Sequence, residues 1–383
     1  MNVVDLFAGP GGWDLAAHRL GLDPLGVEWD AAACATREAA GLRTVQADVA
    51  ELNPLDYAPC DLLIASPPCQ AWSTAGKGGG RRDIDLCVQA VHDLAAGNDT
   101  RAELAAKCED RRSILVAEPL RWALALKPRL LAWEQVPPVL EMWSLCAQLL
   151  GQAGYHTAVG LLSSERYGVP QTRQRAFLIA STEGSVSLPM PTHQRYVAPK
   201  KVDPEAVGLF DAPERERIVL PEDRHLLPWV SMAQALGWEA GTLAVHIPYG
   251  EGMIERHGDR TPRPDSEPAG VVTSKTRSAE WVALRAGTNR NDVVRAQDEP
   301  SPTLRCQPAI TIAGDSRLFQ PGGHHEPGQQ SQNAVRVSVQ EASILQSFPP
   351  EYPWQGSRTK QYEQIGNAVP PLLAEAVLRA VIA

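Results

Sequence analysis

A cysteine on a stiff, proline-rich turn is the residue of this 383-residue chain best suited to nucleophilic chemistry. Ser66-Pro67-Pro68-Cys69-Gln70 follows the short apolar run 61–65, whose pattern predicts a buried strand. Ligands bind at the carboxyl edge of open α/β sheets, so we expect the Cys69 thiol at that edge. A thiol alone is more often simply buried, and the assignment therefore depends on the rest of the chain.

The segment that follows the cysteine, residues 71–82, is rich in glycine and ends in two arginines. Its composition predicts a mobile cationic loop next to a rigidly held thiol. Such a loop is suited to close over an anionic substrate, and we expect residues 73–82 to act as a lid.

Acidic and glycine-rich stretches end three successive predicted strands near the N-terminus. The turn Ala8-Gly9-Pro10-Gly11-Gly12 follows strand 3–7 and precedes a predicted helix over 13–20, while Glu28 and Asp48 end the next two strands. A glycine turn alone is equally typical of a plain tight turn. The three strand ends together predict a nucleotide-like cofactor, with Glu28 placed to hold ribose hydroxyls. No lysine follows the glycines, which argues against a Walker-type phosphate loop.

Two further strands end or begin with groups of catalytic type. Glu134 follows the apolar run 129–133, and Gln171-Thr172-Arg173-Gln174-Arg175 leads into the apolar run 176–180. The alternation predicts that the Gln and Arg side chains share one face. Two guanidiniums directed inward require anions or acceptors there.

Composition limits the class of protein. The net charge is −9, and the seven cysteines form no C-x-x-C pair, which argues against a zinc site and a disulfide framework and fits a reducing cytoplasm. No run of about eighteen apolar residues predicts a membrane span, and no secretory signal is visible at the N-terminus. A nucleic-acid partner would require a local basic face rather than a basic total.

The texture of the chain predicts three parts. Residues 1–182 read as a catalytic and cofactor-binding domain, 183–335 as an inserted domain of short β-like runs, and 336–383 as a helical return to the first domain. A weak repeat with an offset of about 32 residues lies in the middle part, near arginines suited to reading base edges and phosphates. Residues 83–112 read as solvated helices without assigned chemistry.

Five stretches in order resemble the cytosine-5 DNA methyltransferase family. They are Asp5-Leu6-Phe7-Ala8-Gly9-Pro10-Gly11-Gly12, Pro67-Pro68-Cys69-Gln70, Glu134-Gln135-Val136, Gln171 through Arg175, and Gly366-Asn367-Ala368-Val369-Pro370. The resemblance implies an α/β fold: a Rossmann-like S-adenosylmethionine-dependent methyltransferase sheet with a smaller, mostly β or irregular inserted target-recognition domain. It also makes the purely structural reading of Cys69 improbable.

The resemblance implies transfer of a methyl group to carbon 5 of a cytosine flipped out of double-stranded DNA. Cys69 would add to carbon 6, because carbon 5 alone is a poor nucleophile. Glu134, with a raised pKa, would protonate the ring or bond to it, and Arg175 with Arg173 beside it would hold the ring carbonyl.

The same matching implies the binding residues. The cofactor S-adenosyl-L-methionine would meet Phe7, Ala8, Gly9, Gly11, Gly12, Glu28, Trp29, Asp48, Val49, Pro68, Leu115, Asn367 and Val369. DNA would meet Gln70, Ser73, Lys77, Arg81, Arg82, Lys275, Arg277, Arg290 and Arg305. No metal is expected. A monomer in the cytoplasm, with a companion restriction endonuclease in the host, is compatible with this reading.

Three departures and four alternatives qualify the resemblance. The insertion between the cysteine loop and Ser113 is longer than the family's minimum, and the acidic total charge is unusual and requires a basic cleft. Gln135 stands where the family usually has asparagine, which puts its support of the cysteine loop in doubt. The alternatives are an RNA cytosine-5 methyltransferase, a catalytically silent DNA-binding regulator, an amino-methylating enzyme and an NAD-type oxidoreductase. The long segment 183–335 favours DNA over RNA, and the presence of Cys69, Glu134 and Arg175 disfavours the other three.

Overall fold

A seven-stranded sheet forms the centre of the molecule. The computed structural model describes residues 1–72, 79–197, 218–237 and 338–383, together with the short segments 243–246, 293–296, 300–302, 311–313 and 334–336. The strand order is β3-β2-β1-β4-β5-β8-β6. The strands are β1 (Val3–Leu6), β2 (Leu25–Glu28), β3 (Thr44–Gln46), β4 (Leu62–Ala65), β5 (Leu130–Gln135), β6 (His156–Ser163) and β8 (Gln174–Ser181).

The sheet is parallel from β3 to β5, whereas β8 runs antiparallel to both of its neighbours. Both faces are covered, which explains why the parallel strands read as continuous apolar runs. The carboxyl ends of β1, β2, β4 and β5 therefore meet at one edge, and the antiparallel β8 begins at that same edge.

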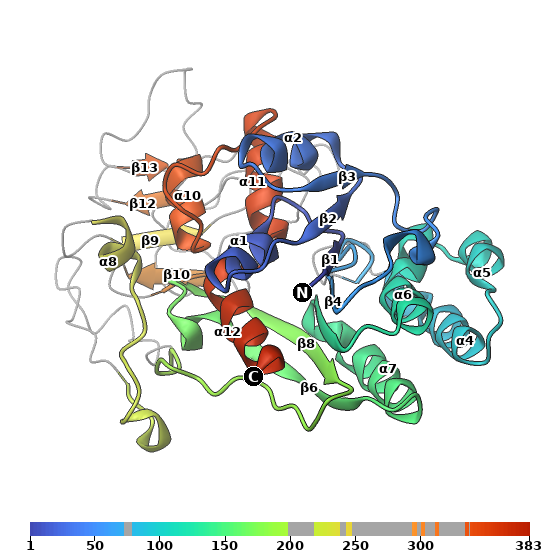
Figure 1. The fold of residues 1–383 in the computed structure, drawn as a ribbon. Coiled ribbons are helices and arrows are strands. Elements are labelled where there is room, and N and C mark those ends of the chain that lie inside the picture. Colours follow the sequence, from blue (N-terminus) through green and yellow to red (C-terminus); the bar gives the residue numbers. More distant parts are fainter. Residues whose placement is uncertain are drawn as a thin grey trace, which may run out of the picture.

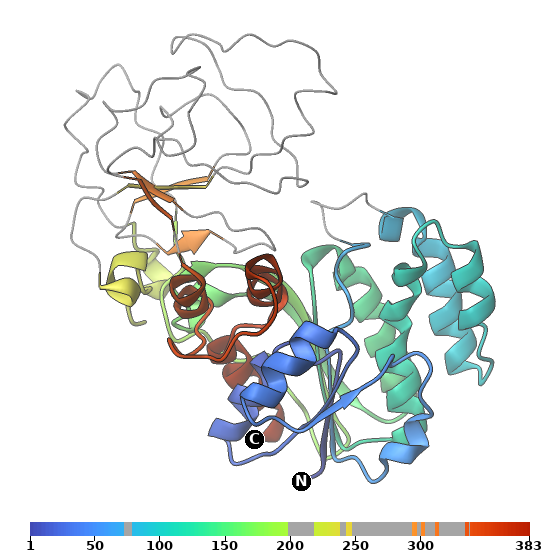
Figure 2. The same cartoon turned by 90° about the horizontal axis from the view of Figure 1, so that it is seen from above.

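Helices cover the two faces of the sheet, as the view from above shows (Figure 2). Helix α1 and the C-terminal helix α12 pack on one face against Leu62, Ile64 and Phe177. Helices α4, α6 and α7 pack on the other face against Leu63 and Trp133. The helices of these two layers are α1 (Gly12–Arg19), α12 (Pro371–Ile382), α4 (Ile84–Ala95), α6 (Glu118–Leu126) and α7 (Leu140–Gln152).

The insertion after the cysteine loop is helical but less solvated than predicted. It consists of α3 (Gly79–Arg82), α4, α5 (Arg101–Lys107) and the 3₁₀ helix η2 (Arg111–Ala117). Helix α4 buries Cys87, Ala90 and Val91 in the core, so the prediction of purely solvated helices was wrong for this element. The amphipathic pattern of residues 113–126 predicts a single helix, but the structure divides this stretch into η2 and α6, because Pro119 lies in the first turn of a new helix.

The C-terminal segment returns to the first half of the chain. Ser338 followed three residues later by Glu341 predicts a capping box, and helix α10 (Val339–Leu345) begins with it: each of the two side chains bonds the other residue's backbone. Helices α11 (Arg358–Asn367) and α12 follow, while α2 (Ala31–Ala39) lies next to α11 (Figure 1). The hydroxyl of Tyr352 donates a hydrogen bond to the carbonyl of Pro10, which fixes this return beside the glycine turn.

Among the described residues, 358–382 is the one segment long and apolar enough to cross a membrane by length and composition. Its most apolar window is 61% buried inside the protein. A break at residues 368–370 divides the segment into α11 and α12. Helix α12 buries Leu373, Val377 and Leu378 on the sheet, which is the behaviour of a core helix.

A second, antiparallel sheet lies in the predicted inserted domain. Its order is β10-β9-β12-β13, formed by β9 (Leu243–His246), β10 (Val293–Ala296), β12 (Thr311–Ala313) and β13 (Ala334–Arg336). Strand β11 (Ser301–Pro302) pairs with β7 (Gln171–Thr172), which precedes β8. The short helix α8 (Met232–Leu236) packs against α10.

The described residues also contain further short 3₁₀ helices besides η2. They are η1 (Pro54–Tyr57), η3 (Pro137–Val139), η4 (Ser164–Tyr167) and η5 (Pro221–Asp223).

Candidate active site

The strand register brings the cysteine turn next to Glu134. Residues Leu62 to Ala65 of β4 pair in parallel with Leu130 to Trp133 of β5. One residue further along each strand, Ser66 therefore stands level with Glu134. The cysteine follows three residues later, on the turn that leaves the sheet.

Cys69 is held on this turn by backbone and side-chain contacts. The Gln135 side-chain amide donates to the carbonyl of Pro67 at 2.6 Å, and the Trp72 amide donates to the carbonyl of Cys69 at 3.0 Å. Gln135 thus supports the cysteine turn although it is longer than the usual asparagine, which resolves the doubt raised by the sequence. The Cys69 side chain is partly exposed, so the turn presents it at the surface of the site.

Burial raises the pKa of the Cys69 thiol above its ordinary value. Arg175 opposes this effect, the Glu134 carboxylate adds to it, and Arg173 again favours the thiolate. The thiol therefore lies within electrostatic reach of the acid and both arginines that the sequence grouped with it.

Glu134 is 5% exposed and pairs with a guanidinium across the sheet. The Nε atom of Arg175 lies 3.1 Å from Oε1 of Glu134. Burial raises the pKa of Glu134, while Arg175, Arg173 and a hydrogen bond from the Ser66 side chain lower it. Burial has the larger effect, and the net shift of the Glu134 pKa is upward, in the direction expected for the predicted acid.

Arg173 faces the C-terminal segment as well as the site. It is 2% exposed, and its Nη1 donates to the carbonyl of Gly366 at 2.8 Å. Gln171 donates to the carbonyl of Leu345 at 3.3 Å. The Gln-Arg-Arg segment therefore holds helices α10 and α11 against the sheet edge, in addition to the single-face pattern predicted from the sequence.

The predicted cofactor turn has uncommon backbone angles and a close contact with the C-terminal segment. Phe7 adopts a φ of +58°, an uncommon conformation for a residue with a side chain. Gly11 has a φ of +103°, and a Cβ on Gly12 would lie 2.1 Å from the carbonyl oxygen of Val369. Glycine is therefore required at 12 for contact with the C-terminal segment. In contrast, a Cβ on Gly9 would meet no atom within 4 Å, so space is open there.

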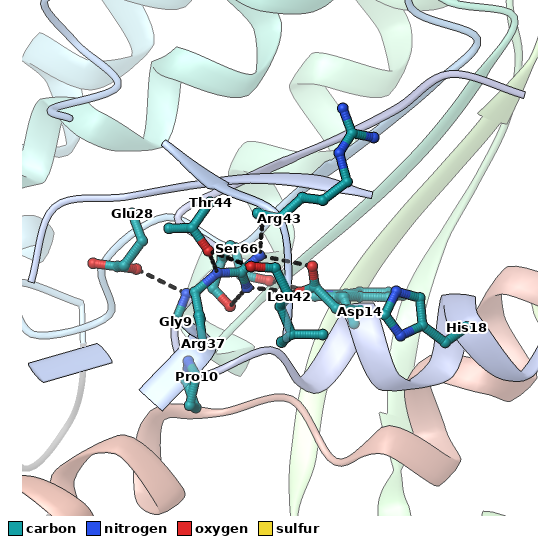
Figure 3. A network of polar contacts seen from close by, with 12 residues as sticks. Gly9, Pro10, Asp14, His18, Glu28, Arg37, Leu42, Arg43, Thr44 and Ser66 are labelled. Carbon is teal, nitrogen blue, oxygen red and sulfur yellow. Dashed lines mark hydrogen bonds and ion pairs between the residues drawn. The ribbon is translucent and has the colours of Figure 1, made fainter. Parts of the chain in front are cut away.

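Glu28 closes one side of this turn (Figure 3). Its Oε2 accepts from the Gly9 amide at 2.8 Å, and its Oε1 accepts from the amides of Trp29 and Asp30, both at 2.8 Å. Burial raises the pKa of Glu28 and the three amides oppose the rise. Trp29 itself is 68% exposed, beside this carboxylate.

The other predicted cofactor residues occupy varied environments. Asp48 lies two residues beyond the end of β3, is exposed and accepts from the Ala50 amide at 2.9 Å. Val49 is 2% exposed. Ala8 and Val369 are buried, while Pro68, Leu115 and Asn367 are half-buried.

Of the predicted DNA-binding residues, Gln70 and Arg82 have described side chains, and both are exposed. Arg82 pairs with Glu109 on the insertion. Arg81 lies in α3. Ser73, Lys77, Lys275, Arg277, Arg290 and Arg305 lie outside the described residues, as does most of the predicted lid.

Two buried polar contacts near the site were not predicted. The Trp13 indole donates to the Ser66 hydroxyl at 2.9 Å, and Arg37 forms a buried pair with Asp14 (Figure 3). Arg37 lies in α2, a helix that was not predicted from the sequence, so there was no signal for the second contact. The first could have been found only by continuing the β4–β5 register beyond the strand ends.

Comparison with known proteins defines the class. The sequence profile described as C-5 cytosine-specific DNA methylase matches residues 1–94 and 102–383. The chain belongs to the C-5 cytosine-specific DNA methylase family. Its sheet and helices form the Rossmann-like methyltransferase fold predicted from the sequence.

The individual relatives share low sequence identity with this chain, although they match it over nearly its whole length. The Type II methyltransferase M1.HphI of Haemophilus parahaemolyticus is 26% identical over 402 residues, which cover 100% of this chain and 87% of that protein. M.DdeI of Desulfomicrobium norvegicum is also 26% identical, over 98% of this chain and 87% of its own length. The crystal structure of the S. pombe Dnmt2 methyltransferase matches the fold with a TM-score of 0.53 at 14% identity, covering 100% of this chain and 98% of that one.

Proposed function

We propose that the protein transfers a methyl group from S-adenosyl-L-methionine to carbon 5 of a flipped-out cytosine in a specific double-stranded DNA sequence. The observation that carries the proposal is the convergence of Cys69, Glu134 and Arg175 at one sheet edge, with Glu134 and Arg175 in contact at 3.1 Å. Family membership and the names of the type II relatives support the choice of DNA as substrate.

The first step assigned to the protein is addition of the Cys69 thiolate to carbon 6 of the ring. This forms a carbon–sulfur bond as the carbon 5–carbon 6 double bond opens, and it makes carbon 5 nucleophilic enough to take a methyl group. Removal of the carbon 5 proton by a base and departure of the Cys69 thiolate then restore the double bond. Burial and the Glu134 carboxylate both disfavour the thiolate. A proton on Glu134 removes that repulsion, so one protonation state prepares both the acid and the nucleophile.

Glu134 supplies a proton or hydrogen bond to the ring nitrogen as electrons enter the ring. Its raised pKa keeps the carboxyl protonated at a higher pH than a free glutamate would be. Arg175 stands on the neighbouring strand with its Nε on Glu134, and its remaining N–H groups are suited to the ring carbonyl. Attack, proton donation and carbonyl binding thus come from three adjacent elements.

The glycine turn fits a nucleoside-bearing cofactor. S-adenosyl-L-methionine, when bound, supplies the methyl group on a sulfonium. Three backbone amides occupy three of the roughly four acceptor positions of the Glu28 carboxylate, which leaves capacity for a ribose hydroxyl. The open space over Gly9 and the exposed Trp29 ring give room and a stacking surface beside it. Val49, Leu115, Asn367 and Val369 would complete the site.

Replacement of Cys69 by serine tests the proposal. Methyl transfer from tritium-labelled cofactor to DNA should disappear, because a serine hydroxyl is far less ionised than a thiol. Cofactor affinity measured by calorimetry should change little. Cys108→Ser, at another partly exposed cysteine, is the matched control and should retain activity. Substantial turnover by the Cys69→Ser protein would overturn the assignment.

We further propose that residues 183–335 form the target-recognition domain between a catalytic domain at 1–182 and its C-terminal return at 336–383. The separate sheet β10-β9-β12-β13 supports this division. Exchanging 183–335 for the matching segment of a relative should redirect methylation to that relative's sequence, as read by bisulfite sequencing. A chimera that keeps the original target would place recognition elsewhere. The monomeric state, the cytoplasmic location and a companion endonuclease stay predictions.

A further inference from the structure

A chain of hydrogen bonds leads from the helix after the glycine turn to the proposed acid. We propose that Ser66 is a positioning residue that holds Glu134 through a hydroxyl whose orientation is set by Trp13. The proposal rests on the proposed function, because it concerns how Glu134 carries its proton. It assigns a role to two residues that do not themselves touch the reacting ring.

The geometry follows from strand register. Ala65 pairs with Trp133, so the next residues, Ser66 and Glu134, stand side by side at the carboxyl ends of β4 and β5. The Ser66 amide donates to the Leu6 carbonyl at 3.2 Å, which fixes the backbone at this point. The hydroxyl therefore lies beside the carboxylate through backbone placement, not through a flexible reach.

The direction of each hydrogen bond is determined by chemistry. An indole N–H can only donate, so the Ser66 oxygen must accept from Trp13, at 2.9 Å. The single hydroxyl hydrogen then remains for Glu134, to which Ser66 is bonded. Trp13 is 2% exposed and packs edge-on against Phe177 at 6.2 Å between ring centroids, so its N–H cannot easily turn away.

Two donors thus hold the Glu134 carboxylate: Ser66 from β4 and Arg175 from β8. In the part of the chain that the structure describes, the charged or titratable groups facing Glu134 are Arg175 and Arg173, together with the Cys69 thiol on the turn after β4. Ser66 differs from these groups because it is a neutral hydrogen-bond donor. A donated hydrogen bond favours the ionised carboxylate, so it opposes burial and limits how far the pKa of Glu134 rises.

Loss of the hydrogen bond from Ser66 should raise the pKa of Glu134. Methyl transfer needs the protonated acid, so the rate falls as pH rises through the pKa of Glu134. Ser66→Ala removes a bond to the ionised form and should move this alkaline limb to higher pH. Trp13→Phe keeps an aromatic ring but removes the indole N–H, so the Ser66 hydroxyl is free to turn. It should produce a smaller shift of the alkaline limb in the same direction.

The experiment measures single-turnover methyl transfer against pH at saturating cofactor and DNA. Ser66→Thr keeps a hydroxyl and should restore the parental profile. The double variant Trp13→Phe/Ser66→Ala should shift no further than Ser66→Ala, because Trp13 acts through Ser66. Cofactor affinity should stay within about threefold of the parent protein in all four variants.

The chain contains a matched control. The Trp354 indole donates to the Ser343 hydroxyl at 3.0 Å, in a cluster away from Glu134. Ser343→Ala breaks the same type of bond and should leave the pH profile unchanged. A Ser66→Ala profile that coincides with the Ser343→Ala profile would overturn the proposal.

A second readout separates this inference from the proposed function. Infrared difference spectra of protein carrying ¹³C-labelled glutamate, with Glu134→Gln to assign the band, follow the carboxyl without any turnover. Ser66→Ala should raise the midpoint of the Glu134 band, and an unchanged midpoint would refute the role of Ser66. If the midpoint shifts but the protein does not methylate DNA, the role of Ser66 stands and the proposed reaction is contradicted. If Ser66→Ala fails to fold, Trp13→Phe is measured in its place.

Discussion

Two guanidinium–carboxylate pairs with buried carboxylates differ in how many of the guanidinium donors are used. Arg37 pairs with Asp14 between helices α2 and α1 (Figure 3), and Arg175 pairs with Glu134 between β8 and β5. Both carboxylates are nearly inaccessible to solvent. Burial alone therefore does not distinguish a structural pair from a catalytic one.

The Arg37 pair is saturated. Its two terminal nitrogens meet the two Asp14 oxygens at 2.7 Å each, in a bidentate arrangement. The remaining N–H groups donate to the hydroxyl of Thr44 and the carbonyls of Arg43 and Ala8. All five donors of the guanidinium are used, so this pair has no capacity left for a ligand.

The Arg175 pair is open. Its Nε meets Glu134 at 3.1 Å, and Nη1 donates to the carbonyl of Gln174 at 2.8 Å. Within the described residues, these two contacts use two of its five N–H groups. Arg175 is half-buried, and none of its N–H groups is both buried and unsatisfied, so the remaining donors are accessible to solvent or to a ligand.

Glu134→Gln should have the largest effect on activity. Loss of the acid should reduce single-turnover methyl transfer by about 10²–10⁴-fold, the range for general acid–base groups. The alkaline limb of the pH profile should vanish, because glutamine does not titrate. The free energy of unfolding should change far less than for the Arg37 variant below. A strong loss of stability with an intact rate would reverse the roles of the two pairs.

Arg37→Leu should have the largest effect on stability. It leaves the Asp14 carboxylate buried without its cation, which costs about 3–5 kcal/mol of unfolding free energy. Denaturant unfolding measures this change. Arg43→Ala, at an exposed pair with Asp23, is the control and should cost less than about 1 kcal/mol. Equal losses in the two variants would contradict a structural role for the buried pair.

The sequence pattern indicated Glu134 and Arg175 as site residues without predicting that they pair, and it indicated neither Arg37 nor Asp14, for a physical reason. Cys69, Glu134 and Arg175 stand at strand ends, where alternation and strand order determine position. Arg37 and Asp14 meet because two helices cross, and crossing geometry depends on packing that the sequence does not display. A second difference concerns a helix end: the glycine at 151 predicts that the helix over 140–150 stops there, but α7 continues to Gln152, and Gly154 takes the left-handed conformation at φ +95°.

Glu28 is an intermediate case, since it is buried without a cation and is held by three amides. Glu28→Ala should weaken cofactor binding by roughly 1.5–3 kcal/mol, the scale of hydrogen bonds to charged groups. Calorimetry measures the affinity, and bisulfite sequencing should show an unchanged DNA target. Glu28→Gln keeps the shape and should lose less. Cofactor affinity equal to that of the parent protein would exclude a ribose contact.

The smallest expected effect concerns Gln135, the residue that joins the turn of the proposed nucleophile to the proposed acid. Gln135 follows Glu134 on β5, and its amide donates to the Pro67 carbonyl at 2.6 Å while its oxygen accepts from the Val136 amide at 2.5 Å. Gln135→Asn shortens the side chain by one methylene, so it should keep one of these bonds and lose or lengthen the other. The loss of a neutral hydrogen bond corresponds to about 0.5–1.5 kcal/mol, so the single-turnover rate should fall by less than about tenfold.

The pH profile tells which function of Gln135 is affected. Because Glu134 keeps its contacts with Arg175 and Ser66, its alkaline limb should stay in place while the amplitude falls. A shift of the alkaline limb of the pH profile would mean that Gln135 couples the cysteine turn to the proposed acid. The group formed by Glu134 and Arg175 would then include Gln135 as a third member.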